Sequence, residues 1–298
     1  MSRSPIVSIL INCFNEEKFI YRSLKSVINQ TFKNWECVVL DDASTDSTIN
    51  IIKNFKDKRI KVYRNKKNLG LGKSRIKAQK YLKGKYISIL DADDFFEKKK
   101  IQEQVRILNK YPNVGLISSW TNVLDLKGVQ VRKFQSFKNN NELKKNLILV
   151  NSLPHSSIMY RSELAKKVGW YSKSYNYAQD YDLTLKILKI SDFYLIKKYL
   201  TNCTTLGKNM SSIKKYRYVA VKETIDILKK NNSKKLLLND TNNLINNVIN
   251  INLLKLIMLD TKFNFLVKII KILKLLILKP SIVLNLFILK KYNEQKKV

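Results

Sequence analysis

Glycine, proline, cysteine and histidine are scarce in this sequence of 298 residues, with 7, 4, 3 and 1 copies respectively. The three cysteines, Cys13, Cys37 and Cys203, are odd in number and lack the spacing of a zinc site. This excludes a disulfide scaffold and fits a reducing compartment such as the cytosol. No G-x-G-x-x-G motif follows the first apolar run, and G-x-x-x-x-G-K-S/T occurs nowhere. These absences exclude a dinucleotide-binding fingerprint and a P-loop.

Acidic residues are also few, since 23 Asp and Glu stand against 57 Lys and Arg, a formal net charge of +34. The excess indicates an anionic partner (a membrane surface, nucleic acid or nucleotides) or a composition biased toward Lys, Asn and Ile. A hydrophobic content of 45% supports a buried core, in one large domain or one domain with an appendage. The first apolar run, residues 6–11, is too short for a signal peptide, so no export signal is expected.

Short apolar runs alternate with helical patterns through the first 90 residues. The predicted strands are Ile6–Ile11, Glu36–Leu40, Ile60–Tyr63 and Tyr86–Leu90. The predicted helices run from about Glu17 to Gln30, from Ser44 or Asp46 to about Phe55, and from Ser74 to Leu82. Because the connections are short, the pattern predicts an α/β fold whose mostly parallel sheet has right-handed crossovers and is flanked by helices.

Polar residues follow three of these strands where each strand ends. They form the groups Phe14-Asn15-Glu16, Asp41-Asp42 and Asp91-x-Asp93. The carboxyl ends of parallel strands meet at one edge of the sheet, where open α/β sheets bind ligands. Paired carboxylates in a D-x-D motif suit Mg²⁺ or Mn²⁺, and such ions hold diphosphates. The alternative for the third group is a strand followed by an acidic helix start, with Asp94 as the cap.

Four segments together resemble the family 2 glycosyltransferases of the GT-A fold. They are PIVSILINCFNEEKFIYRSLKSVINQTF, ECVVLDDASTDST, NLGLGKSRIKA and YISILDADD, and the likeness extends over about residues 5 to 190. The resemblance implies that Phe14 lies against a nucleobase and that Asp41 accepts from the ring N–H of uracil. It also places Asn15, Glu16 and Arg75 in the nucleotide site, Asp91 at the ribose or metal shell, and Asp93 on Mn²⁺ or Mg²⁺.

The next stretch predicts a helix at Phe95–Lys110, a strand at Val114–Trp120, a hairpin around Gly128 and a helix at Asn139–Val150. The single histidine, His155, follows in Leu153–Arg161, a segment that precedes the acceptor half of the site in the family. A structural or substrate-lining role is favoured for His155 over metal ligation or catalysis.

Gln179-Asp180-Tyr181-Asp182-Leu183 resembles the family's Glu-Asp motif at a helix start, whose Asp is the base of inverting members. Asp180 falls on that Asp, and Gln179 replaces the usual Glu. The alternative is a carboxylate placed at a helix N-terminus by the helix dipole. The Q-x-x-R-W signature of processive members is absent, which predicts transfer of one sugar per encounter.

Beyond about residue 210 the composition shifts to Lys, Asn, Leu and Ile, so the expected division is a catalytic domain at 1–210 and a basic helical tail at 211–298. Helical patterns cover Ser212–Lys230, Lys234–Asp260 and Lys262–Leu278. Twelve apolar residues between 263 and 278 favour membrane insertion by roughly 4 to 7 kcal/mol, but three central lysines oppose it by roughly 8 to 10 kcal/mol. The tail is therefore expected to lie on an anionic membrane surface, or else to pack as an appendage.

These expectations combine into a metal-dependent, inverting hexosyltransferase. The predicted donor is a UDP-hexose or UDP-N-acetylhexosamine, and the acceptor is a glycan or lipid-linked glycan of cell-surface polysaccharide. The predicted location is the cytoplasm, peripheral on the inner face of the cell membrane, and nucleic acid is not an expected partner. A sugar-1-phosphate nucleotidyltransferase and a non-catalytic basic binding protein are the alternatives. The first would carry a Gly-rich basic loop after strand one, and the second leaves the carboxylates at three strand ends unexplained.

Overall fold

The computed structural model describes residues 4–135, 147, 153–205, 214–233, 242–260 and 265–278. The strands are β1 (Val7–Cys13), β2 (Trp35–Asp41), β3 (Ile60–Arg64), β4 (Tyr86–Ile89), β5 (Phe95–Phe96), β6 (Val114–Leu124), β7 (Gln130–Phe134), β8 (Met159–Arg161) and β9 (Asp192–Thr204). The helices are α1 (Ile20–Ile28), α2 (Thr48–Lys53), α3 (Leu71–Ala78), α4 (Lys100–Lys110), α6 (Ser162–Lys167), α7 (Gln179–Leu188), α8 (Lys214–Ser233), α9 (Asn242–Leu259) and α10 (Phe265–Leu278). Two 3₁₀ turns are η1 (Gln79–Tyr81) and η2 (His155–Ser157).

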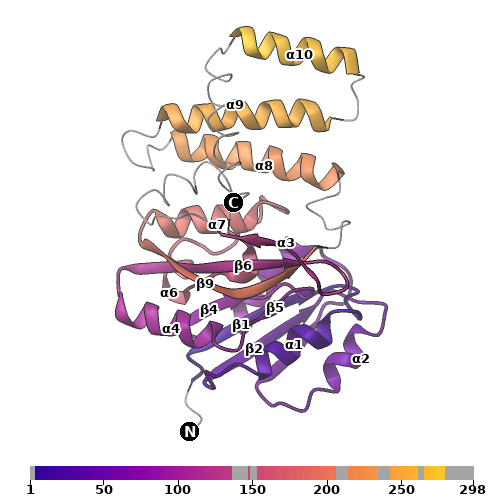
Figure 1. The fold of residues 1–298 in the computed structure, drawn as a ribbon, viewed down its shortest axis with the longest axis vertical. Coiled ribbons are helices and arrows are strands. Elements are labelled where there is room, and N and C mark those ends of the chain that lie inside the picture. Colours follow the sequence, from indigo (N-terminus) through magenta and orange to yellow (C-terminus); the bar gives the residue numbers. More distant parts are fainter. Residues whose placement is uncertain are drawn as a thin grey trace. The chain divides into compact units, whose positions relative to one another are not determined.

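The strands form one mixed sheet in the order β3-β2-β1-β4-β8-β6-β9-β5, with β7 paired to β6 (Figure 1). β3, β2, β1 and β4 are parallel, as the alternation of strands and helices predicts. The other half is mixed, because β8 runs antiparallel to both β4 and β6, whereas β6 and β9 are parallel. The predicted α/β fold, a sheet flanked by helices, is confirmed.

The core follows from the two periodicities of the sequence. Alternate residues of β1, from Val7 to Cys13, point to one face and are buried there with the apolar stripe of α1. That stripe has the i, i+4, i+7 spacing of Ile20, Leu24 and Val27. β2 is buried along its whole length, as expected for a parallel strand covered on both faces.

Several predicted boundaries are wrong, and tertiary contacts explain each one. The helix predicted at Phe95–Lys110 begins only at Lys100, because Phe95 and Phe96 form a short strand paired with β9. The same start excludes Asp94 as the cap of that helix. The strand predicted to end at Trp120 continues to Leu124 alongside β9.

The hairpin predicted around Gly128 is confirmed, since β6 and β7 pair antiparallel across it and Gly128 has a φ of +82°. A left-handed φ of this kind suits glycine. The helix predicted at residues 139–150 lies, apart from residue 147, outside the described part of the chain.

The chain divides into two compact units, one of Met1–Lys144 with Ser152–Leu206 and one of Lys145–Asn151 with Gly207–Val298. Within the second unit α8 packs against α9, and α9 packs against α10. In the described residues, no helix has both the length and the apolar character needed to cross a bilayer.

Candidate active site

The three predicted polar groups do lie along one edge of the sheet. In the β1–β2 register Cys13 stands opposite Asp41, so the loops after these strands start side by side. β4 lies on the other side of β1, with Ile89 opposite Leu10, so its Asp91-x-Asp93 turn starts at the same edge. Because all three strands are parallel, their carboxyl ends are brought together by the topology.

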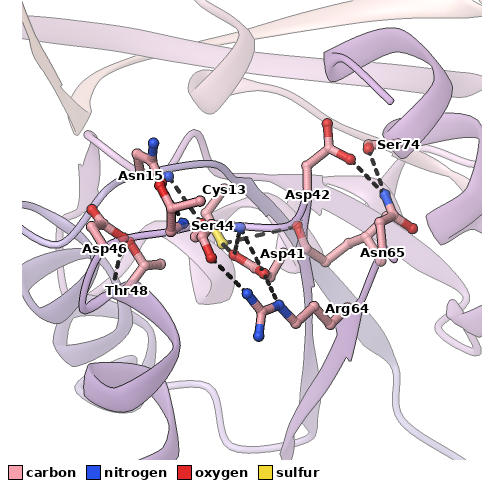
Figure 2. A network of polar contacts seen from close by, with 12 residues as sticks. Cys13, Asn15, Asp41, Asp42, Ser44, Asp46, Thr48, Arg64, Asn65 and Ser74 are labelled. Carbon is pink, nitrogen blue, oxygen red and sulfur yellow. Dashed lines mark hydrogen bonds and ion pairs between the residues drawn. The ribbon is translucent and has the colours of Figure 1, made fainter. Parts of the chain in front are cut away.

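The loop after β1 is joined to the loop after β2 by hydrogen bonds between main chain and side chain (Figure 2). The Asn15 N–H donates to Ser44 Oγ at 2.9 Å, and the Glu16 N–H donates to Thr48 Oγ1 at 2.8 Å. The Asn15 side-chain oxygen accepts from the Thr45 N–H at 2.8 Å. Asn15 thus uses its side-chain oxygen within the protein, while its neighbour Phe14 is 43% exposed beside it.

Asp41 is fully buried, and its carboxylate already has partners (Figure 2). Arg64 Nε at the end of β3 lies 3.0 Å from Asp41 Oδ2, and the Ser44 N–H donates to the same carboxylate at 3.1 Å. Arg64 also donates from Nη2 to the Ser44 carbonyl at 2.6 Å, while about half of its side chain stays exposed. Any group that is to reach Asp41 must therefore displace or join Arg64.

Asp42 has a different function from its neighbour, because it orders the loop before α3. Its carboxylate accepts from the N–H groups of Leu69 and Gly70, at 2.9 and 2.8 Å, and from the Asn65 side chain at 2.7 Å. Figure 2 shows Asn65 between Asp42 and Ser74. These bonds, with a φ of +80° at Gly70, begin α3 at Leu71, three residues before the predicted start.

Arg75, predicted to contact the nucleotide, is buried and forms an ion pair with Asp91 at 2.8 Å between Nη2 and Oδ1. A helix residue that faced solvent would show neither this burial nor this ion pair. His155 joins the pair, with Nδ1 3.8 Å from Asp91 Oδ1, and its Nε2 lies 3.2 Å from the Tyr171 hydroxyl. Burial acts to raise the pKa of Asp91, but the Arg75 guanidinium and His155 outweigh it and hold that pKa well below its usual range.

Asp93 is in the opposite electrostatic situation. Partial burial and the charge of Asp91 raise the pKa of Asp93 to about 6. Burial, followed by Asp93 and Asp91, also raises the pKa of Glu16 to about 8, so Glu16 lies within electrostatic reach of both. Several carboxyl groups thus lie close together at this edge, and burial and their mutual repulsion favour the protonated forms of Glu16 and Asp93. A bound cation would relieve this repulsion.

Asp94 belongs to the protein interior rather than to this edge. Ser156 Oγ donates to Asp94 Oδ2, and the Thr204 N–H donates to Asp94 Oδ1 at 2.9 Å. Burial raises the pKa of Asp94 well above its usual range, and the charges of Asp93 and Asp91 add to the shift. A protonated Asp94 would serve as a structural hydrogen-bonding group beneath the edge.

The donor atoms at this edge fit a Mg²⁺ or Mn²⁺ ion that is shared with a substrate. Asp91 and Asp93 supply hard carboxylate oxygens, and burial and the charge of Asp91 keep the pKa of Asp93 raised although the charge of Arg22 opposes the shift. In the part of the chain described, no three or more His, Cys, Asp or Glu side chains are arranged to hold a metal by themselves. Such ions keep near-octahedral coordination through one or two carboxylates plus phosphate oxygens, which agrees with this incomplete set.

Asp180 and Asp182 both lie in the first turn of α7 but in different surroundings. Asp182 is buried, and its Oδ2 forms an ion pair with Lys186 Nζ at 2.6 Å, one turn later. Asp180 is half-buried. Burial raises the pKa of Tyr171 to about 12, Arg75 opposes the shift, and the charges of Asp180 and Asp91 add to it. Tyr171 therefore lies within electrostatic reach of both Asp180 and the D-x-D turn.

Gln179, which replaces the family's Glu, is fully buried against the start of α3. A Cβ placed on Gly72 would lie 2.9 Å from Gln179 Oε1 and 3.0 Å from the Tyr175 carbonyl oxygen. Glycine at position 72 thus suits the close approach of α3 to the segment before α7, where the Tyr175 main chain has the least room to move. Gln179 also donates from Nε2 to the Asn176 carbonyl at 3.1 Å.

Three further residues of the site, Arg22, Arg64 and Tyr171, were not predicted from the sequence. Arg22 on α1 donates from Nη2 to the Asp93 carbonyl at 3.0 Å and to Thr204 Oγ1 at 2.6 Å, and its guanidinium carbon lies 4.5 Å from the Phe95 ring centroid. Arg22 and Tyr171 reach the site from positions distant in the chain, and an isolated arginine or tyrosine is too common for its spacing to mark it.

The mixed sheet and the acidic edge are those of an α/β enzyme of the GT-A type. Residues 8–169 match the family described as Glycosyl transferase family 2. An uncharacterized glycosyltransferase of Methanocaldococcus jannaschii is 32% identical over 229 residues, which cover 73% of this chain and 79% of that protein. The chain belongs to glycosyl transferase family 2.

Two solved structures share the fold at lower identity. Staphylococcus aureus TarS, crystallised with UDP-GlcNAc, has a TM-score of 0.66 and 23% identity, covering 83% of this chain and 71% of that chain. A mannosyltransferase of Pyrobaculum calidifontis in complex with GDP-Man and Mn²⁺ has a TM-score of 0.57 and 18% identity, covering 77% of this chain and 64% of that chain. At these identities the likeness establishes the fold alone.

Proposed function

We propose that this enzyme is a hexosyltransferase that moves one sugar, with inversion, from a UDP-hexose or UDP-N-acetylhexosamine to a glycan or lipid-linked acceptor in cell-surface polysaccharide synthesis. The observation that carries the proposal is the gathering of Glu16, Asp91 and Asp93 at one sheet edge, with Tyr171 within reach of both that edge and Asp180. The UDP-GlcNAc bound to TarS supports a UDP-linked donor.

The nucleotide binds over the ends of β1 and β2. The exposed ring of Phe14 offers a flat apolar surface for the base. Asp41 accepts the ring N–H of uracil once Arg64 gives way or shares the carboxylate, because Asp41 is covered in the present arrangement. Arg75, held by Asp91, directs its remaining N–H donors toward phosphate or ribose oxygens.

Asp93, with Asp91 beside it, would hold the divalent cation. When bound, that cation supplies Lewis-acid stabilisation of the charge that grows on the departing diphosphate. The Mn²⁺ in the mannosyltransferase of the same fold supports this assignment. Arg22 and Thr204 hold the Asp93 main chain through its carbonyl oxygen, so the carboxylate is presented from a fixed turn.

Asp180 accepts the proton of the acceptor hydroxyl as that oxygen attacks the anomeric carbon from the face opposite the diphosphate. The sugar–diphosphate bond breaks as the new glycosidic bond forms. Because the displacement occurs in a single step, it inverts the anomeric centre and needs no covalent sugar–enzyme intermediate. The absence of Q-x-x-R-W supports release after a single transfer.

The test is incubation with individual UDP-sugars and Mn²⁺, with UDP release and the product followed by mass spectrometry. A nucleotidyltransferase would instead release pyrophosphate from UTP and a sugar phosphate, and a non-catalytic basic protein would release neither. Release of UDP from no donor in the presence of Mn²⁺ and a panel of glycan acceptors would contradict the proposal.

The second unit associates with the inner face of the cell membrane through α10, which makes the enzyme a peripheral cytoplasmic protein. Phe265, Ile269 and Leu273 are exposed at i, i+4, i+8 spacing, so α10 presents an apolar stripe to solvent. Lys268 borders the stripe and suits anionic headgroups, whereas Lys271 and Lys274 lie toward the opposite side of α10. In cosedimentation with anionic vesicles, a Phe265→Ser/Leu273→Ser variant should stay in the supernatant. If the variant and the wild type pellet equally, the alternative is favoured that the tail packs as an appendage and does not lie on a membrane.

A further inference from the structure

A lysine lies in the interior of the catalytic unit without a carboxylate partner. Lys100, the first residue of α4, has no exposed surface. Its Nζ donates to Ser88 Oγ at 3.0 Å and to Gln104 Oε1 at 2.8 Å, and it lies 4.0 Å from the Phe96 ring centroid. Burial lowers the pKa of Lys100 well below its usual range. Burying a lysine away from water without a compensating carboxylate is unfavourable for stability.

The bonds of Lys100 continue to the short turn η2. Gln104 accepts from Lys100 through Oε1, which leaves Nε2 to donate to the Ser157 carbonyl at 2.8 Å. Ser157 Oγ donates to the Pro154 carbonyl at 2.6 Å and lies 2.6 Å from Ser118 Oγ on β6. Since the Ser157 proton is used for Pro154, Ser118 is the donor of the second bond. η2 is thereby held from α4 and from β6.

The same turn also contacts the D-x-D motif. Ser156 Oγ accepts from the Asp91 N–H at 3.0 Å and donates to Asp94 Oδ2. His155 Nδ1 lies 3.8 Å from Asp91 Oδ1. In addition, Lys100 bonds Ser88 on β4, three residues before Asp91 in the turn that follows this strand. A shift of η2 would therefore move both the main chain and the electrostatic partner of Asp91.

We propose that Lys100 and Gln104 are positioning residues, which set the place of η2 and through it the geometry of Asp91 in the metal and diphosphate site. The assignment of that site rests on the proposed function, but the hydrogen-bonded path does not. Neither residue touches substrate. An apolar pair would fill the same space without directing a donor at the Ser157 carbonyl.

The discriminating variant is Lys100→Met, which keeps the side-chain length and removes the donor. We expect a melting temperature close to that of the wild type, because the gain from removing a buried amine is offset by the loss of the donor to Gln104 Oε1 and Ser88 Oγ. We expect kcat to be lower by about 10- to 100-fold with little change in KM for the donor, because small misplacements at a reacting centre have effects of this size. The matched control is Lys61→Met. Lys61 holds the buried Glu36 carboxylate, on strands of the same sheet but remote from η2, and this variant should lower the melting temperature without changing kcat.

A second readout does not depend on turnover. His155 is the single histidine of the chain, so its ring signals in an NMR spectrum of tag-free protein report directly on η2. Lys100→Met should shift these signals, and Lys61→Met should not. Unchanged His155 signals in Lys100→Met would overturn the proposal, whether or not UDP-sugar turnover is detected. Turnover absent from the wild type would instead contradict the proposed function.

Gln104→Glu provides the test if Lys100→Met fails to fold. The glutamate still accepts from Lys100 but replaces the donor to the Ser157 carbonyl by an oxygen. We expect the His155 shift and the loss of kcat to reappear in this variant. Wild-type kcat together with wild-type His155 signals in Gln104→Glu would refute the role of the network.

Discussion

The two carboxylates of the first turn of α7 give the sharpest test of the mechanism. Asp180 and Asp182 are two residues apart, so their side chains leave the helix about 200° apart and cannot serve the same site. Asp182 is paired with Lys186 at 2.6 Å inside the protein, whereas the charge of Asp180 reaches Tyr171 near the D-x-D turn. We therefore expect Asp180→Asn to affect chemistry and Asp182→Asn to affect stability.

The expected magnitudes differ in kind as well as in size. A positioned general base contributes about 10²- to 10⁴-fold, so Asp180→Asn should raise the barrier by roughly 2.7 to 5.4 kcal/mol. Asp182→Asn weakens a mostly buried i, i+4 ion pair, which we place at about 1 kcal/mol of the free energy of unfolding. In a protein of this size that corresponds to a fall in melting temperature of about 2–4 °C.

The assay is single-turnover transfer from the UDP-sugar, with UDP affinity measured separately by calorimetry. Asp180→Asn should bind UDP and Mn²⁺ like the wild type and transfer slowly, and Asp182→Asn should transfer normally. If Asp182→Asn abolishes transfer while Asp180→Asn retains it, the base has been placed two residues too early. If both variants transfer normally, the presence of Gln179 marks an enzyme that does not use the family's base at this position.

Three further outcomes follow from other parts of the catalytic unit. Asp93→Asn should raise the melting temperature of the metal-free protein at pH 8, since it removes a carboxylate whose pKa is raised to about 6. The variant should also lose the rise in melting temperature that Mn²⁺ and UDP give the wild type. If that rise persists, Asp93 is not a metal ligand. Burial acts to raise the pKa of Glu36, but its hydrogen bonds, of which the one from Lys61 has the largest effect, lower it. The ionised Glu36 therefore stabilises the fold above about pH 4.5, and this contribution is lost as the pH falls through the folded-state pKa. Urea titrations of Glu36→Gln should show about 1–3 kcal/mol lost at pH 7 and a smaller loss at pH 3, and a pH-independent loss would contradict this reasoning. Gly72→Ala should be destabilised by about 1–3 kcal/mol, because the overlap of the new Cβ with Gln179 Oε1 outweighs the gain of about 1 kcal/mol in helix propensity. A variant more stable than the wild type would show that this contact can relax.

Local patterns predicted the parallel half of the sheet and failed where partners came from elsewhere in the chain. Four apolar runs bounded by polar clusters identified β1, β2, β3 and β4, because a strand buried on both faces has few compatible compositions. The start of α4 was predicted too early, since Phe95 and Phe96 pair with β9, more than a hundred residues later. The start of α3 was predicted too late, since Asp42 provides the bonds that order the preceding loop.

The amino-acid sequence by itself determined the family and the candidate residues at the sheet edge, because motif order and the position of polar residues after buried strands are local properties. Only the tertiary structure decided the ionisation and the partners of each charged side chain. Asp91 and Asp93 are two residues apart, yet their pKa values shift in opposite directions. Arg75 and His155 hold the pKa of Asp91 low, whereas burial and the charge of Asp91 raise the pKa of Asp93. The ionisation of a carboxylate depends on solvent exclusion and on charges within a few ångströms. Those neighbours come from α3 and η2, 16 and 64 residues away from Asp91, at distances that no local pattern encodes.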